Sequence, residues 1–197
     1  MALIKSSLWV EVPDTKENIE QSLKDFGIKD YTINEDLSVD VDDDVMLCNF
    51  ELTKIPFKFG KVSGSFLCDA NQLTSLEGAP KEVGGSFDCS GNELTSLKSS
   101  PKIVGGSFDC SHNYLSSLEF APESIGNNFY CEGNQLSSLG FLPDTIVGSF
   151  WCCDNQLTTL DGCPNSVIIN FHCYGNPRPF AISYIKSMVA VGGEIRN

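Results

Sequence analysis

The stretch Gly64-Ser-Phe-Leu-Cys-Asp-Ala-Asn-Gln-Leu-Thr-Ser-Leu-Glu-Gly-Ala-Pro-Lys-Glu-Val83 is the unit that the rest of the chain repeats every 21 residues. In each copy a phenylalanine is followed by a cysteine, an asparagine, two leucines, a proline and a valine or isoleucine, at constant spacing. Self-similarity at this period predicts a solenoid, in which each copy forms one coil and packs on its neighbours. The first two columns contain Phe66, Phe87, Phe108, Phe129, Phe150 and Phe171, and Cys68, Cys89, Cys110, Cys131, Cys152 and Cys173.

Alternation within one copy predicts a short strand with one buried and one outward face. In residues 86–90, Phe87 and Cys89 are expected to point inward and Asp88 outward, because successive side chains of a strand alternate. Asn92 leaves the strand, where its side chain can hydrogen-bond backbone groups of the turn. The returning part of each coil is predicted to be mostly irregular, so the fold class is an α/β repeat solenoid with a stack of parallel strands.

The residues before the array predict a cap that covers the apolar cross-section of the first coil. A strand or covering segment is expected over Leu3 to Val12. A helix is expected over residues 15–26, with Asp14 as its N-cap and Gly27 as its stop. Alternation over residues 31–41 predicts a β-hairpin.

Helical spacing after the last copy predicts a second cap. The last regular strand is expected over residues 170–174, followed by a helix over about 179–190 that Gly192-Gly193 ends. The predicted division is an N-terminal cap at 1–44, a solenoid of about six coils at 45–176 and a C-terminal capping helix at 177–197, all within one structural domain.

Composition limits the classes of partner. The 197 residues carry 13 Lys and Arg against 26 Asp and Glu, so the formal net charge is −13. Such acidity disfavours direct binding to the phosphates of nucleic acid. We expect a cytoplasmic protein without a membrane-bound state, since no secretory signal pattern or apolar run of about 18 residues occurs.

Nine cysteines would suggest disulfides in a small secreted protein. Six of them instead fill one column of the repeat, where parallel strands about 4.8 Å apart hold the Cβ atoms wider than the ~3.8 Å that a disulfide prefers. We therefore expect a reduced ladder of cysteines that pack as small apolar side chains.

The run Phe-x-Cys-x-x-Asn-x-Leu-x-x-Leu resembles the signature of the leucine-rich-repeat family. The short copy, with Thr-Ser-Leu and then a proline, is similar to the bacterial effector type and closer still to phage-encoded repeat proteins, over residues 31–176. The chain departs from the signature at its first leucine, where Gly84 stands. The resemblance implies protein–protein recognition, no catalytic residue, and a host factor or defence component in the host cytoplasm as the target.

Two groups of residues could suggest a metal, and we favour neither. Asp40, Asp42, Asp44 and Glu51 match a calcium loop, but Val45 stands where the loop needs glycine. His172, Cys152, Cys153 and Cys173 belong to adjacent copies, yet alternation points Cys152 and Cys173 inward and the other two outward, so they should not converge on zinc. No metal, other cofactor or enzymatic activity is expected.

Outward positions are where a repeat protein can encode recognition, because core positions are fixed by stacking. The position between the phenylalanine and the cysteine changes from small or acidic to large and aromatic in the C-terminal half of the array, and so does the position after the cysteine. Exposed tyrosine and tryptophan are typical of binding hot spots. The predicted partner-binding residues are Tyr130, Trp151, His172, Tyr174, Asp88, Asp109 and Glu132.

These features predict a noncatalytic scaffold that binds a protein. One alternative is an acidic decoy that mimics nucleic acid through Asp40, Asp42, Asp43, Asp44, Asp69, Asp88, Asp109 and Glu132. Another is a structural component of a larger assembly. The sequence leaves open whether a cap or a second copy of the chain covers the aromatic patch, and hence whether a homo-oligomer forms.

Overall fold

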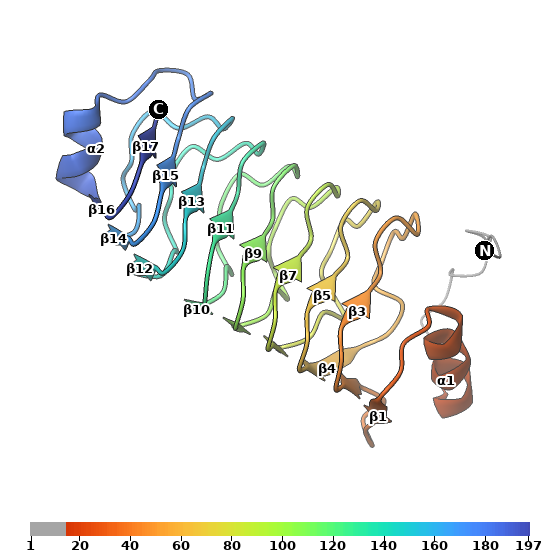
Figure 1. Ribbon diagram of the computed structural model, residues 1–197. Coiled ribbons are helices and arrows are strands. Elements are labelled where there is room, and N and C mark those ends of the chain that lie inside the picture. Colours follow the sequence, from red (N-terminus) through yellow and green to blue (C-terminus); the bar gives the residue numbers. More distant parts are fainter. Residues whose placement is uncertain (1–14) are drawn as a thin grey trace.

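The 21-residue copies stack as a parallel-strand β-solenoid of about eight turns with few helices (Figure 1). The computed structural model describes residues 15–197, so the segment expected over residues 3–12 lies outside the described part. The phenylalanine positions begin two-residue strands that pair in parallel as one eight-stranded sheet. Its strands are β3 (Val45–Met46), β5 (Phe66–Leu67), β7 (Phe87–Asp88), β9 (Phe108–Asp109), β11 (Phe129–Tyr130), β13 (Phe150–Trp151), β15 (Phe171–His172) and β17 (Ile195–Arg196).

The returning side of each coil is more regular than the sequence analysis predicted. The valine or isoleucine column forms a second ladder of short strands, divided into a six-stranded and a three-stranded sheet. The larger contains β1 (Tyr31–Ile33), β2 (Val39–Val41), β4 (Phe59–Val62), β6 (Glu82–Val83), β8 (Ile103–Val104) and β10 (Ser124–Ile125). The smaller contains β12 (Thr145–Ile146), β14 (Ser166–Val167) and β16 (Ala190–Val191). The α/β expectation therefore overstated the helical content.

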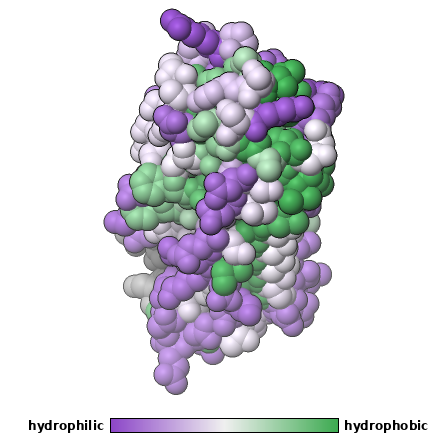
Figure 2. Space-filling view, turned by 90° about the vertical axis from the view of Figure 1, so that its left-hand side faces the viewer, coloured by the Kyte–Doolittle hydropathy of each residue, from purple (hydrophilic) through white to green (hydrophobic). Residues whose placement is uncertain are grey.

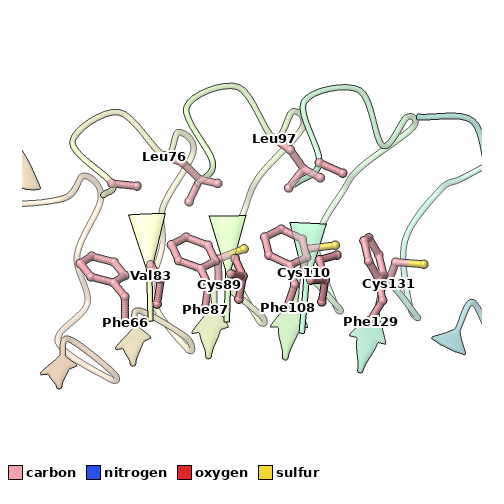
Figure 3. Packing of buried hydrophobic residues seen from close by; sticks show 14 of the residues in the cluster. Phe66, Leu76, Val83, Phe87, Cys89, Leu97, Phe108, Cys110, Phe129 and Cys131 are labelled. Carbon is pink, nitrogen blue, oxygen red and sulfur yellow. The ribbon is translucent and has the colours of Figure 1, made fainter. Parts of the chain in front are cut away.

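The core lies between the two sheets and follows the predicted inward columns. Phe87, Cys89 and Leu97 are fully buried, and their equivalents stack above and below them (Figure 3). Phe66 and Phe87 lie with ring centroids 5.6 Å apart and nearly parallel. All nine cysteines are free thiols in the described chain, as expected. Burial raises the pKa of the thiols in the column well above its usual value, Cys89 among them, so these side chains stay protonated and apolar.

The buried asparagines join each coil to its neighbours through the backbone, as their position in the turn predicted. Asn113 Oδ1 accepts a hydrogen bond from the Leu94 amide at 3.0 Å. Its Nδ2 donates to the carbonyl oxygens of Cys89, Cys110 and Ser111 at 3.0–3.2 Å. The side chain therefore satisfies polar groups of two coils that have no access to water.

The N-terminal helix and hairpin form where the pattern predicted them. Helix α1 (Lys16–Asp25) buries Ile19 and Leu23, and β1 pairs antiparallel with β2. Thr15, rather than Asp14, is the N-cap, because its side chain accepts the hydrogen bond from the amide of Asn18. Strand β2 also pairs in parallel with β4, so the hairpin extends the six-stranded sheet.

The C-terminal residues continue both sheets, which the sequence analysis missed. Helix α2 is shorter than predicted, Ile182–Met188, and is followed by β16 and β17. These strands pair in parallel with β14 and β15. Gly192 and Gly193 thus occupy the glycine pair of an eighth coil, and the strand array does not end near residue 174. Neither helix of residues 15–197 is long and apolar enough to span a membrane.

Candidate binding surface

The outward column of the eight-stranded sheet brings most of the predicted partner-binding residues into register. Parallel pairing places Asp88 beside Asp109, and Tyr130 beside Trp151 on the neighbouring strand. His172 follows Trp151 in the same row, and Arg196 follows His172. Acidic side chains thus occupy one part of the sheet and aromatic side chains the next. Tyr130, Trp151 and His172 together form the aromatic column.

The rings of the aromatic column lie against one another. Trp151 and His172 stack with centroids 3.9 Å apart and planes at 24°. Tyr130 and Trp151 are tilted at a centroid distance of 6.1 Å. Both Tyr130 and Trp151 are half-buried, so each still offers part of its surface to solvent. Rings held by such contacts lose little conformational entropy when a partner binds.

His172 is far less exposed than the sequence analysis assumed. Only 3% of the residue is exposed, because Trp151 covers one side and strand β17, with Arg196, lies on the other. Neither ring nitrogen has a hydrogen-bond partner among the described residues. Burial, with a smaller effect of the Arg196 charge, lowers the pKa of His172. The imidazole is therefore a neutral support for Trp151 and presents little surface of its own.

Tyr174 and Cys153 lie in the second outward column. Tyr174 is 40% exposed, while Cys153 is 1% exposed although its position was predicted to face solvent. Burial raises the pKa of the Cys153 thiol to about 12, despite a hydrogen bond with Tyr174 that acts in the opposite direction. Outward-facing residues of closely stacked strands are thus covered by their neighbours, and Tyr174 remains available at the surface.

The acidic residues of the sheet are held within their own turns. Asp109 Oδ1 accepts hydrogen bonds from the Ser111 amide at 2.9 Å and the Ser111 hydroxyl at 2.6 Å. Asp88 makes the equivalent bond to the Ser90 amide. Burial raises the pKa of the Asp88, Asp109 and Glu132 carboxyl groups, and the like charges of neighbouring carboxylates add to the rise. These groups are less strongly acidic than freely solvated carboxylates.

Exposed aliphatic residues add to the hydrophobic surface of the last coils. Figure 2 shows the end of the molecule that carries α2, where hydrophobic residues gather between hydrophilic ones. Val147 and Ile168 are each 51% exposed, and Ile169 is 46% exposed. The C-terminal half therefore carries exposed aliphatic side chains in addition to the aromatic column.

In the first of the two groups considered for metals, two carboxylates accept hydrogen bonds from backbone amides of the next coil. Asp40 Oδ1 accepts from the Lys61 amide at 2.7 Å, and Asp44 Oδ1 accepts from the Ser65 amide at 2.6 Å. Each carboxylate thereby links its coil to the next. In residues 15–197 no three His, Cys, Asp or Glu side chains form a group suited to a metal ion.

The burial of the His172 imidazole predicts how its ring titrates and how stability depends on pH. The chain has two histidines, so the ring protons of His172 can be followed by NMR. We expect His172 to titrate below the usual value of about 6.5. Because its folded-state pKa is lowered, its contribution to stability is present above about pH 6.5 and is lost as the pH falls through the folded-state pKa. Titration at or above pH 6.5 would contradict the buried, neutral assignment, and His172→Phe should remove this part of the acid sensitivity.

Comparison with known proteins identifies no family. A scan against protein-family models finds no match. A search of curated proteins finds no significant relative.

Proposed function

We propose that the chain is a noncatalytic scaffold that binds a protein through the aromatic column and Tyr174. The observation that carries this proposal is the stack of Trp151 on His172, which fixes a half-exposed indole in register with Tyr130. Indole and phenol rings combine apolar area with a hydrogen-bonding group and are enriched in binding hot spots.

The acidic column supports a partner with basic residues beside the aromatic contact. Asp109 and Glu132 lie on the strands or turns next to Tyr130, and the chain carries a net charge of −13. Such charges favour fast association and orient the partner more than they add affinity. A nucleic-acid-mimicking decoy is the weaker proposal, because the raised pKa values and internal hydrogen bonds of Asp88 and Asp109 reduce their likeness to solvated phosphates.

The same proposal includes the family likeness of the repeat and the roles of its two helices. The repeated Phe-x-Cys-x-x-Asn-x-Leu-x-x-Leu pattern supports a place beside leucine-rich-repeat proteins of phage type. Under this proposal α1 and α2 act as caps, and the target is a host factor or defence component in the host cytoplasm. Contact of the Tyr184 hydroxyl with the Leu160 amide, at 3.2 Å, supports the capping role of α2.

The test is the affinity of a partner for a Trp151→Ala variant. Proteins captured from host lysate by the natural chain would be identified, and the dissociation constant measured for each purified candidate. We expect Trp151→Ala to weaken binding of the true partner by at least about 2 kcal/mol, or roughly 30-fold in the dissociation constant, as hot-spot truncations do.

A matched control separates binding from folding. Tyr114→Ala removes a 55%-exposed aromatic ring outside the aromatic column and should leave affinity unchanged. Circular dichroism must show both variants folded at the assay temperature, since Trp151→Ala also uncovers His172. Equal affinity of the natural chain and Trp151→Ala would rule out this surface.

A further inference from the structure

A groove with a hydrophobic floor lies on the other side of the solenoid, where three successive coils enter the six-stranded sheet. It has a volume of about 580 Å³, within the usual ~300–1,000 Å³ of small-molecule sites. Ile55, Phe57, Phe59 and Ala79 form its floor, and each is at most 9% exposed. Phe57 and Phe59 pack against each other, with ring centroids 4.8 Å apart. The groove therefore lies over packed core side chains.

The rim of the groove carries an unusual share of the positive charge. Lys54, Lys58, Lys81 and Lys102 line it, and Glu77 is the one acidic residue among the lining. The whole chain has only 13 Lys and Arg against 26 Asp and Glu. A cluster of four lysines around an apolar floor is thus a local reversal of the overall charge.

Lys58 and Lys102 have carboxylate partners outside the lining. Lys58 pairs with Asp36, and Lys102 pairs with Glu123 at 2.8 Å. All four side chains in these pairs are more than half exposed. Exposed pairs of this kind contribute little free energy and exchange readily with a competing anion.

The groove exists because one turn position changes size along the repeat. Gly78 and Ser99 occupy it beside the groove, while the next two copies have Phe120 and Phe141. All four residues have positive φ, between 71° and 95°, so their backbones turn alike. A phenylalanine at 78 or 99 would place a ring at the rim, and the small residues leave this space open.

We propose that this groove binds a small amphipathic organic anion. Its apolar body lies over Phe57 and Ile55, and its carboxylate is bound by Lys81 and Lys102, which succeed each other on adjacent coils. Charge-assisted hydrogen bonds from two ammonium groups select an anion, and the apolar floor selects a hydrocarbon or aromatic body over a simple inorganic ion. The site is separate from the aromatic column and does not depend on its function.

The test compares octanoate with 1-octanol, which has the same chain length without the charge. Isothermal titration of the full chain should show one octanoate site, at least about tenfold tighter than any site for 1-octanol. Ser99→Phe should weaken octanoate at least about tenfold by filling the groove. The double variant Lys81→Gln, Lys102→Gln should bind octanoate with an affinity close to that for 1-octanol. Lys98→Gln and Phe141→Ser, which change residues outside the lining, are the controls.

Several outcomes would overturn the proposal. If octanoate bound Ser99→Phe as tightly as it binds the natural chain, it would occupy another site. Absence of saturable binding up to about 10 mM, far above the range of useful affinities, would mean that the groove holds no such ligand. The natural ligand would instead be an acidic peptide if hexaglutamate competed with octanoate and bound Ser99→Phe with unchanged affinity. In that case the affinity for hexaglutamate should also depend on Lys81 and Lys102. Self-association that Ser99→Phe abolishes would identify a second copy of the chain.

Discussion

Asn113→Ala is expected to lower the free energy of unfolding by about 4 kcal/mol, more than any other single change considered. The side chain is 4% exposed and makes four hydrogen bonds to the backbone. Its loss leaves the Leu94 amide without that acceptor in the core, which costs about 1–3 kcal/mol. The carbonyl oxygens of Cys89 and Cys110 each keep one hydrogen-bond donor, from Asn92 and Asn134. Losing the Asn113 donor therefore costs less free energy at these two oxygens than at the Leu94 amide.

Asn113→Asp distinguishes the donor half of the side chain from the acceptor half. The carboxylate can still accept from Leu94, but its second oxygen faces carbonyl oxygens and cannot donate to them. We expect a loss comparable to that of Asn113→Ala at pH 7. Burial should raise the pKa of this carboxyl group, so the variant should regain stability relative to the natural chain as the pH falls.

Urea unfolding followed by circular dichroism measures both changes. The neighbouring Tyr114→Ala removes an exposed ring, keeps the backbone bond from Tyr114 to Leu94 and should change stability by less than about 0.5 kcal/mol. If Asn113→Ala were no worse than Tyr114→Ala, the asparagine column would contribute little to joining the coils.

The repeat allowed the core to be predicted because each inward position recurs with one chemical type. Phe87 and Cys89 are buried as expected. The eighth coil was missed because α2 lengthens the interval from Phe171 to Ile195 to 24 residues. The order Val191-Gly-Gly followed by Ile195 could have revealed it, since it matches Val83-Gly-Gly followed by Phe87.

The candidate site was predicted in outline but not in its burial. Alternation correctly placed Tyr130 and Trp151 on one face, because strand parity follows from sequence spacing alone. It could not show that His172 is covered, since that depends on the missed strand β17 and on the ring angle of Trp151. The groove lined by Lys54, Lys58, Lys81 and Lys102 was also missed, because it depends on how three coils pack and no motif within one copy encodes it.

Glycine at positions 84, 105 and 126 of one repeat column permits close stacking of the coils, and Gly105→Ala should disturb it. A Cβ atom at position 105 would lie 2.1 Å from the carbonyl oxygen of Gly84, a backbone atom that no side-chain rotation can move. The same contact recurs at Gly126, whose added Cβ would lie 2.0 Å from the Gly105 carbonyl oxygen. The absence of a side chain at Gly105 and Gly126 therefore permits this close approach of the coils.

The column does not contain glycine in every copy. Val147 is the first residue after Gly126 in the column with a branched side chain, and the second ladder is interrupted between β10 and β12, just before it. Strand pairing resumes between β12 and β14, so the break is confined to one junction. Ile168, which is also branched, occupies the column where pairing resumes, and its amide still donates to the Ile146 carbonyl oxygen at 3.0 Å, so a side chain in this column does not by itself interrupt the ladder.

Gly105→Ala should cost about 3 kcal/mol, from overpacking and from weakened hydrogen bonds such as the one from the Gly105 amide to the Val83 carbonyl oxygen. Gly140→Ala is the matched control, because its added Cβ would meet no atom within 4 Å. Urea unfolding should show Gly140→Ala within about 0.5 kcal/mol of the natural chain. If the two variants unfolded alike, close approach at Gly105 would not control the stacking.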